Sequence, residues 1–162
     1  MNPAEALQHK LLPALRESER HLRRLRYATS RSKELFPLSA ERYLNLSDPE
    51  VASLDQMLFR FGKLQDAIGQ RLLPAILLAG QEWQDNATFL DKLNRLEKLG
   101  AVPSALEWIK LRDRRNNAMH EYPDEPEVNA ANLNAVYASI ATLEAHLNRA
   151  RAYVQEHFKL PE

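Results

Sequence analysis

Apolar residues recur along most of this chain at steps of three and four positions, which is the spacing of one face of an α-helix. The first such stripe follows Asn2 and Pro3, a pair that fits a helix cap and a first helical residue. This stripe contains Leu7, Leu11, Leu15, Leu22 and Leu25. No stretch alternates apolar and polar residues convincingly enough for a strand, so the pattern predicts an all-α chain.

A second long helix is predicted from Ser47 toward Gly80, because Ser-Asp-Pro is typical of a helix start and glycine of a helix end. Pro13 and Pro74 lie inside the first and second helices. A proline removes a backbone hydrogen bond and its ring collides with the preceding turn, so we expect a kink at each.

The second half of the chain predicts three more helices. A short one over 88–100 and a fourth over 104–122 each begin with a capping-box pair. Pro123 disfavours helical geometry at Tyr122 and must end the fourth helix. From Pro126 the apolar spacing predicts a last helix of about thirty residues.

Long helices joined by short loops favour an antiparallel up-and-down bundle of four main helices plus one short helix. No repeat or linker divides the 162 residues, so we expect a single domain over 1–162. The first and last helices are long enough to leave apolar surface for a second copy. A homodimer is therefore expected, with a longer packing seam inside one chain as the alternative.

The 22 basic and 22 acidic residues cancel, so any binding of anions must be local. The segment 16–33 is the strongest basic run. Its basic residues are Arg16, Arg20, Arg23, Arg24, Arg26, Arg31 and Lys33, and its acids are Glu17 and Glu19. Two interpretations stay open: a surface that tracks phosphates, or a solvated helix face followed by a basic loop.

The lack of cysteine excludes disulfides and thiolate chemistry and suits a reducing compartment. The longest apolar run, 72–79, is interrupted by Pro74 and is too short for a membrane span. The N-terminus lacks the basic start and the apolar core of a signal peptide. We therefore expect a cytoplasmic protein with no membrane association.

Candidate chemistry lies at the end of the fourth helix. One line of that helix, at steps of three or four, consists of Val102, Leu106, Ile109, Asp113, Asn116 and His120. We expect this line to face inward and to turn polar at Asp113. The neighbouring line brings Arg115 and Tyr122 beside the same polar end. Burying such groups without partners costs roughly 1–3 kcal/mol each, so they must either find partners inside the fold or lie in a cleft. The cleft is the functional interpretation.

The residue types at this polar end suit cleavage of RNA without a metal. Arg115 offers a planar, permanently charged fork for a phosphate, and His120 a group that titrates near neutral pH. Asn116 is placed to orient the imidazole or a substrate hydroxyl. Cleavage also needs an acid for the leaving oxygen, which a second His120 in a dimer would supply.

The spacing alone is not specific, because Arg16 to His21 and Arg151 to His157 show similar spacing in this chain. The context of Arg115 to His120 is what distinguishes it. Asn116 follows the arginine, Tyr122 lies two positions past the histidine, and a proline ends the helix there.

With this context, the segment "LRDRRNNAMHEY" (111–122) resembles the motif of the HEPN superfamily (higher eukaryotes and prokaryotes nucleotide-binding). The form with a tyrosine two past the histidine is similar to HepT-like ribonuclease toxins. Arg115, Asn116, His120 and Tyr122 match that motif one for one. The resemblance is strongest over 104–122. The segment "FRFGKLQDAIG" (59–69) is similar to the second helix of nucleotidyltransferase-associated HEPN proteins, with Asp66 matching an acid that they carry.

The resemblance implies a HEPN-like bundle that dimerises into one composite ribonuclease cleft, with no metal and no cofactor, cleaving RNA such as tRNA or mRNA. It also implies a minimal nucleotidyltransferase antitoxin that transfers AMP to Tyr122. Asp66 and Asp113 are candidates for supporting roles. Two alternatives remain: a non-catalytic HEPN protein that binds nucleotides or serves as substrate-binding partner of a nucleotidyltransferase, and an unrelated helical dimer. The extended N-terminal arm departs from the compact toxins.

Overall fold

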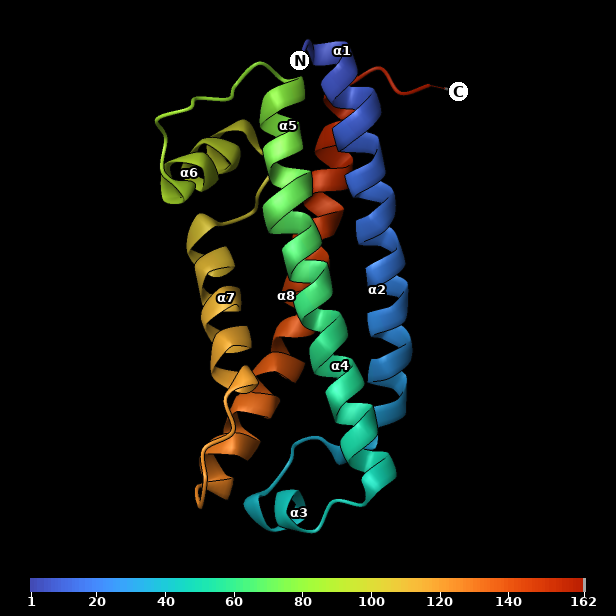
Figure 1. Cartoon of the computed structure of the whole chain (residues 1–162), viewed down its shortest axis with the longest axis vertical. Coiled ribbons are helices and arrows are strands. Elements are labelled where there is room, and N and C mark those ends of the chain that lie inside the picture. The colour runs from blue at the N-terminus through green and yellow to red at the C-terminus, as the bar shows by residue number, and fades with distance from the viewer. Residues whose placement is uncertain (162) are drawn as a thin grey trace.

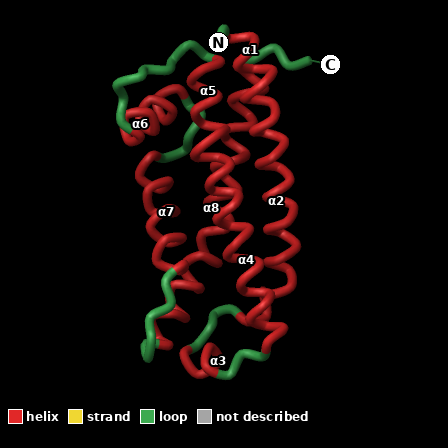
Figure 2. Tube along the Cα trace, viewed as in Figure 1, coloured by secondary structure: helices red, strands yellow, loops and turns green. Residues whose placement is uncertain are grey.

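The computed structural model describes residues 1–161, and in that range helices and loops account for the chain, with no strand (Figure 2). Four long helical segments run up and down in an antiparallel bundle (Figure 1). They are α1 (Pro3–Ala6) with η1 (Leu7–Leu11) and α2 (Leu12–Ser32), α4 (Asp48–Ala67) with η3 (Ile68–Leu72) and α5 (Leu73–Ala79), α7 (Ala105–Met119), and α8 (Pro126–His157).

The all-α prediction is therefore confirmed, as are the four main helices and the short one before α7. That short helix is α6 (Phe89–Leu99), capped by Thr88 and closed by Gly100 in a left-handed conformation. Two short elements were not predicted: the 3₁₀ turn η2 (Lys33–Leu35) and the helix α3 (Ala40–Leu44). Five residues are too few to show an apolar stripe, and only the serine cap at Ser39 marks where α3 begins.

The two long N-terminal segments continue through their prolines. Each proline is preceded by a five-residue π-helical turn, η1 before Pro13 and η3 before Pro74. A proline has no N–H to donate, and its ring collides with the carbonyl four residues back, so a locally wider turn accommodates it. A kink was predicted at each proline, and the structure has a π-helical turn just before each one.

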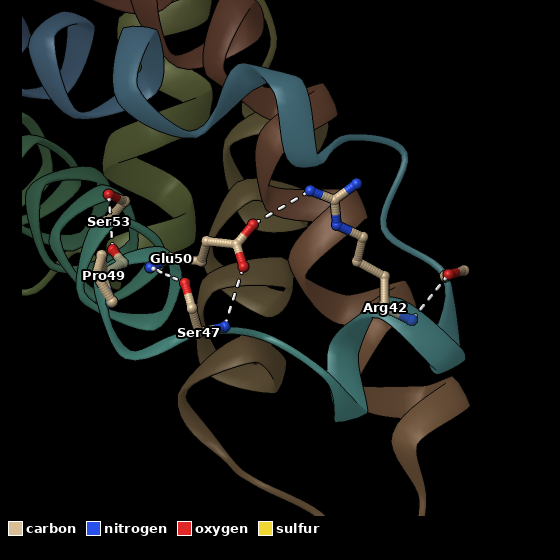
Figure 3. Close-up of polar contacts among 6 residues, drawn as sticks. Arg42, Ser47, Pro49, Glu50 and Ser53 are labelled. Atoms are coloured by element: carbon tan, nitrogen blue, oxygen red, sulfur yellow. Dashed lines mark hydrogen bonds and ion pairs between the residues drawn. The ribbon is translucent and has the colours of Figure 1, made fainter.

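Local side-chain contacts fix the start of α4 (Figure 3). The Ser47 hydroxyl accepts a hydrogen bond from the Glu50 backbone N–H, at 3.3 Å, and the Glu50 carboxylate accepts one from the Ser47 N–H, at 3.0 Å. Arg42, which follows the cap of α3, pairs with the same carboxylate at 3.1 Å. This reciprocal pair of hydrogen bonds satisfies two backbone donors that a helix start leaves free, and it fixes where α4 begins.

The basic segment 16–33 is helical over more of its length than expected. Helix α2 continues to Ser32, so Arg31 is helical and no basic loop begins there. The buried side chains of α2 include Leu22 and Leu25, which pack into the bundle core, while the arginines from Arg16 to Arg31 are exposed. The expectation of a basic loop was wrong because the apolar spacing of α2 persists one turn further than its arginines suggested.

Helix α4 lies between α2 and α7, and α8 packs behind it against both neighbours (Figure 1). Their buried apolar side chains form one continuous core, with Phe61, Leu111 and Leu143 at its centre. In the described part of the chain, no helix is both long and apolar enough to cross a membrane.

Candidate functional site

Two glycines, Gly62 on α4 and Gly69 on η3, let α7 approach closely. A Cβ at Gly62 would lie 3.3 Å from Nε of Arg115, and a Cβ at Gly69 would lie 2.9 Å from Cζ2 of Trp108. The two glycines are seven residues apart, as are Trp108 and Arg115, so both pairs lie on facing stripes of antiparallel helices. The missing Cβ atoms make the room in which the indole and the guanidinium lie.

This packing corrects the predicted inward line of α7. Leu106 is 64% exposed, and Asp113, Asn116 and His120 continue its line on the outside of the helix. The buried line is the neighbouring one, with Trp108 at 1% exposure. Both lines are apolar at the start of α7, so the sequence of α7 alone does not decide which line is buried. Gly62 and Gly69 on the facing segment decide it.

A cleft of about 260 Å³ opens between α4 and α7. Its lining includes Gln65, Asp66, Phe89, Arg112, Arg115 and Asn116. Nη2 of Arg115 lies 3.5 Å from Oδ2 of Asp66, and their side chains are 30% and 38% exposed. The pair is thus partly solvated, and its attraction is weak enough for an incoming anion to compete for the guanidinium.

Several polar atoms buried around this cleft have no hydrogen-bond partner in residues 1–161. They are Oε1 and Nε2 of Gln65, Nε1 of Trp108 and Nε of Arg115. Leaving such an atom unpaired costs roughly 1–3 kcal/mol, so buried polar atoms nearly always have a protein or water partner. Their position on one cleft indicates that it receives water or a ligand that can both donate and accept hydrogen bonds.

His120 lines a different and larger cleft, of about 500 Å³, formed by α3, the first half of α4, the end of α7 and the start of α8. It is the first residue after α7 and has extended backbone geometry. On the same cleft, the hydroxyl of Tyr43 donates to Oε1 of Glu121 at 3.1 Å. Burial raises the pKa of Tyr43, and the hydrogen bond and charge of Glu121 raise it further, so the phenol keeps its proton.

The structure therefore brings some of the predicted residues together and separates others. Arg115, Asn116 and Asp66 share the α4–α7 cleft, whereas His120 lines the other cleft of the same chain. Asp113 is exposed and lines neither of the two. Arg115 and His120 do not meet in one cleft of a single chain.

Tyr122 lies past the end of α7, which ends at Met119 and not at 122, and its side chain is half-buried and not exposed. The buried side chain of Asn129 fixes its backbone from both sides. The Tyr122 N–H donates to Oδ1 of Asn129 at 2.9 Å, and Nδ2 of Asn129 donates to the Tyr122 carbonyl at 3.0 Å. The rings of His120 and Tyr122 are 6.4 Å apart in an edge-on arrangement. This clamp holds the loop after α7 in one position beside His120.

Sequence reasoning did not find Gln65 or Arg112. The signal for Gln65 was present, because it lies between Gly62 and Gly69, whose seven-residue spacing marks a helix face approached by another helix. Arg112 is one turn before Asn116 and was treated only as part of the motif. Its guanidinium carbon lies 4.9 Å from the Phe89 ring centroid, which joins α6 to the cleft.

No protein-family model matches the chain, and no curated protein or solved structure matches it either. The family resemblance therefore rests on residues 59–69 and 104–122. Within residues 1–161, no three histidine or carboxylate side chains gather closely enough to hold a metal ion.

Proposed function

We propose that the chain is a HEPN-like endoribonuclease toxin that acts as a homodimer and cleaves RNA, such as tRNA or mRNA, in the cytoplasm. The observation that carries the proposal is the α4–α7 cleft, where Arg115, Asn116 and Asp66 meet beside hydrogen-bonding atoms that have no protein partner. A guanidinium offers two parallel N–H donors, which match two phosphate oxygens.

The proposed reaction uses the ribose 2′-hydroxyl as the nucleophile. His120 removes its proton, and the 2′-oxygen attacks the adjacent phosphorus. As this bond forms, the bond from phosphorus to the 5′-oxygen of the next nucleotide breaks. A proton delivered to that oxygen completes a 5′-hydroxyl and leaves a 2′,3′-cyclic phosphate. Arg115 stabilises the negative charge that develops at the phosphorus, and Asn116 orients the imidazole or the hydroxyl.

Two chains are part of the proposal because Arg115 and His120 line different clefts of one chain. If the ends of two α7 helices meet, His120 of the partner subunit reaches the phosphate bound by Arg115. The dimer also supplies both a base and an acid, which cleavage without a metal requires. Apolar side chains beside this end offer the surface to be covered. They are Leu44, Val51 and Met119, exposed by 68%, 40% and 58%.

The test is cleavage of total RNA or tRNA in the presence of EDTA. His120→Ala should reduce cleavage by about 10²- to 10⁴-fold, the range of general acid–base catalysis. His157→Ala is the matched control, because this exposed histidine follows Arg151 at a similar spacing. No cleavage by wild-type protein freed of AMP, or equal cleavage by wild type and both variants, would overturn the proposal.

Regulation by a minimal nucleotidyltransferase antitoxin is the second part of the proposal. Its supporting observation is the position of Tyr122 beside His120, on a loop clamped by Asn129. An AMP group on that phenol adds a bulky anion that would repel RNA. Co-expression with such an enzyme should raise the intact mass in AMP-sized steps, and Tyr122→Phe should remove them. A rise that persists in this variant would assign the modification to another residue.

One observation favours the alternative, a non-catalytic HEPN protein that binds nucleotides or a nucleotidyltransferase. Arg115 already pairs with Asp66, and His120 lies on another cleft, so one chain holds a binding cleft without its base. This alternative predicts tight association with a nucleotidyltransferase and no RNA cleavage at any protein concentration. Cleavage that disappears in His120→Ala would exclude it.

A further inference from the structure

The outer face of α2 carries a stripe of cations. Given about 100° of rotation per residue, the stripe covers an arc of roughly 100°. Its members are Arg16, Arg20, Arg23, Arg24, Tyr27 and Arg31, and all of them are exposed. Among residues 1–161, none of these five arginines has an acid within ion-pair distance, whereas Arg26 of the same helix pairs with Glu144 of α8.

The two acids of α2 flank the stripe and pair with residues outside it. Glu17 pairs with Arg71 and His21 on the side of α4 and α5, and Glu19 pairs with Arg151 of α8 at 2.9 Å. Like charges three or four residues apart destabilise a helix by roughly 0.2–0.5 kcal/mol per pair. The stripe therefore carries repulsion between its arginines, which a bound anion would reduce.

The positive surface continues onto α4. Phe59 is 53% exposed, with the guanidinium of Arg60 5.3 Å and the ammonium of Lys63 5.4 Å from its ring centroid. Burial lowers the pKa of His21 on α2, the hydrogen bond and charge of Glu17 oppose this, and the charges of Arg60 and Lys63 also lower it, which places these two cations near α2. An exposed aromatic ring beside two cations can stack on an unpaired base next to its phosphates.

This surface ends at the α4–α7 cleft. Lys63 directly follows Gly62, whose Cβ position lies 3.3 Å from Nε of Arg115. Helix α4 lies between α2 and α7 on one side of the bundle (Figure 1). Two acids near the path, Glu17 and Asp66, are paired with arginines, and the exposed Asp55 lies one turn before Phe59 on α4. Cations thus extend from α2, across Phe59, to Arg115.

We propose that single-stranded RNA lies across α4, with its phosphates on Arg20, Arg24 and Lys63 and one base stacked on Phe59, and that it enters the cleft at Arg115. Taking RNA as the ligand rests on the proposed function. Single-stranded RNA fits better than a duplex, because only unpaired bases offer a face to an aromatic ring. An anionic membrane fits less well, since the stripe exposes arginines and one tyrosine and no apolar side chain that would insert.

The test is binding of a labelled single-stranded RNA of about 12 nucleotides to His120→Ala protein, measured by fluorescence anisotropy. Phe59→Ala should weaken binding at least about fivefold, the effect of losing one stacked base. Phe59→Leu should weaken it similarly, because leucine has no ring, whereas Phe59→Trp should restore it. Unchanged binding in Phe59→Ala would overturn the stacking role.

The charge contacts are tested by salt dependence. Each phosphate contact contributes about −0.7 to the slope of log K against log salt for single strands. Replacing Arg20, Arg24 and Lys63 by glutamine should therefore reduce the slope by about 2. The control is Arg95→Gln, an exposed arginine paired with Glu82 at the far side of α6. An unchanged slope, or binding to phosphatidylserine vesicles but not to RNA, would overturn the inference.

Binding and cleavage separate this inference from the proposed function. Phe59-dependent binding of RNA without any cleavage by wild-type protein would remove the ribonuclease proposal and leave the RNA surface standing. Cleavage by wild-type protein, together with RNA binding that is unchanged when Phe59, Lys63 and Arg24 are replaced, would remove the RNA surface and leave the ribonuclease proposal standing.

Discussion

At the scale of residues, the candidate site depends on two glycines, which have no side chain that could bind a ligand or react. Gly62 of α4 faces Arg115, and Gly69 of η3, seven residues further on, faces Trp108. Glycine inside a helix is less stable than alanine by roughly 1 kcal/mol, so each glycine has a local cost. Close approach of α7 is the physical reason that these positions tolerate it.

The two glycines should respond differently to the same substitution. In Gly69→Ala the new Cβ would lie 2.9 Å from the buried Trp108 ring, which has no room to move, so we expect a net loss of about 1–2 kcal/mol in the free energy of unfolding. In Gly62→Ala the neighbour is the half-exposed Arg115 side chain, which can shift, so stability should change little or rise. Urea unfolding measures both. Equal losses in the two variants would contradict this packing.

Gly62→Ala has a second expected effect, because the shift that relieves the contact displaces the Arg115 guanidinium. RNA cleavage should therefore fall in this variant while stability is kept. The shift needed is a few tenths of an ångström. This is less than the displacement of about 1 Å that reduces a rate by roughly 100-fold, so we expect a loss smaller than about 100-fold. Full activity in Gly62→Ala would mean that the position of Arg115 does not depend on this glycine.

At the scale of elements, the start of α4 is fixed by the reciprocal contacts of Ser47 and Glu50 (Figure 3). Ser47→Ala should lower the free energy of unfolding by about 1 kcal/mol, the usual effect of losing a helix cap. Ser53→Ala is the control, because its hydroxyl only donates to the Pro49 carbonyl, at 3.1 Å. That variant should stay within about 0.5 kcal/mol of wild type. Thermal unfolding of both would show whether the cap stabilises the fold.

The elements themselves were predictable because their signals are local. The apolar stripes predicted the long helices nearly at their observed bounds. The cap at Thr88 and the stop at Gly100 predicted the ends of α6, and the cap at Ser104 predicted the start of α7. The orientation of α7 was not predictable, since Leu106 and Trp108 begin equally apolar lines and the choice is made by glycines about 40 residues earlier in the chain. Family resemblance suggested Asp66, but its pairing with Arg115 needed the tertiary structure.

At the scale of the whole molecule, the account requires a dimer. Light scattering during size-exclusion chromatography should give a mass of about twice the 18.6 kDa of one chain. Cleavage per chain should fall on dilution below the dissociation constant of the dimer, because Arg115 and His120 line separate clefts. Cleavage by a monomer, at a rate independent of protein concentration, would contradict the composite cleft.

The central claim is that the Arg115 guanidinium binds and stabilises the reacting phosphate. The most direct measurement compares the initial rate of tRNA cleavage, in EDTA, for Arg115→Gln and Arg114→Gln. Arg114 is the matched control, because it lies next on the same helix and its Nη1 donates to Ser139 of α8 at 2.8 Å. We predict a loss of about 10²- to 10³-fold for Arg115→Gln and a rate close to wild type for Arg114→Gln. Equal rates in the two variants would contradict the account.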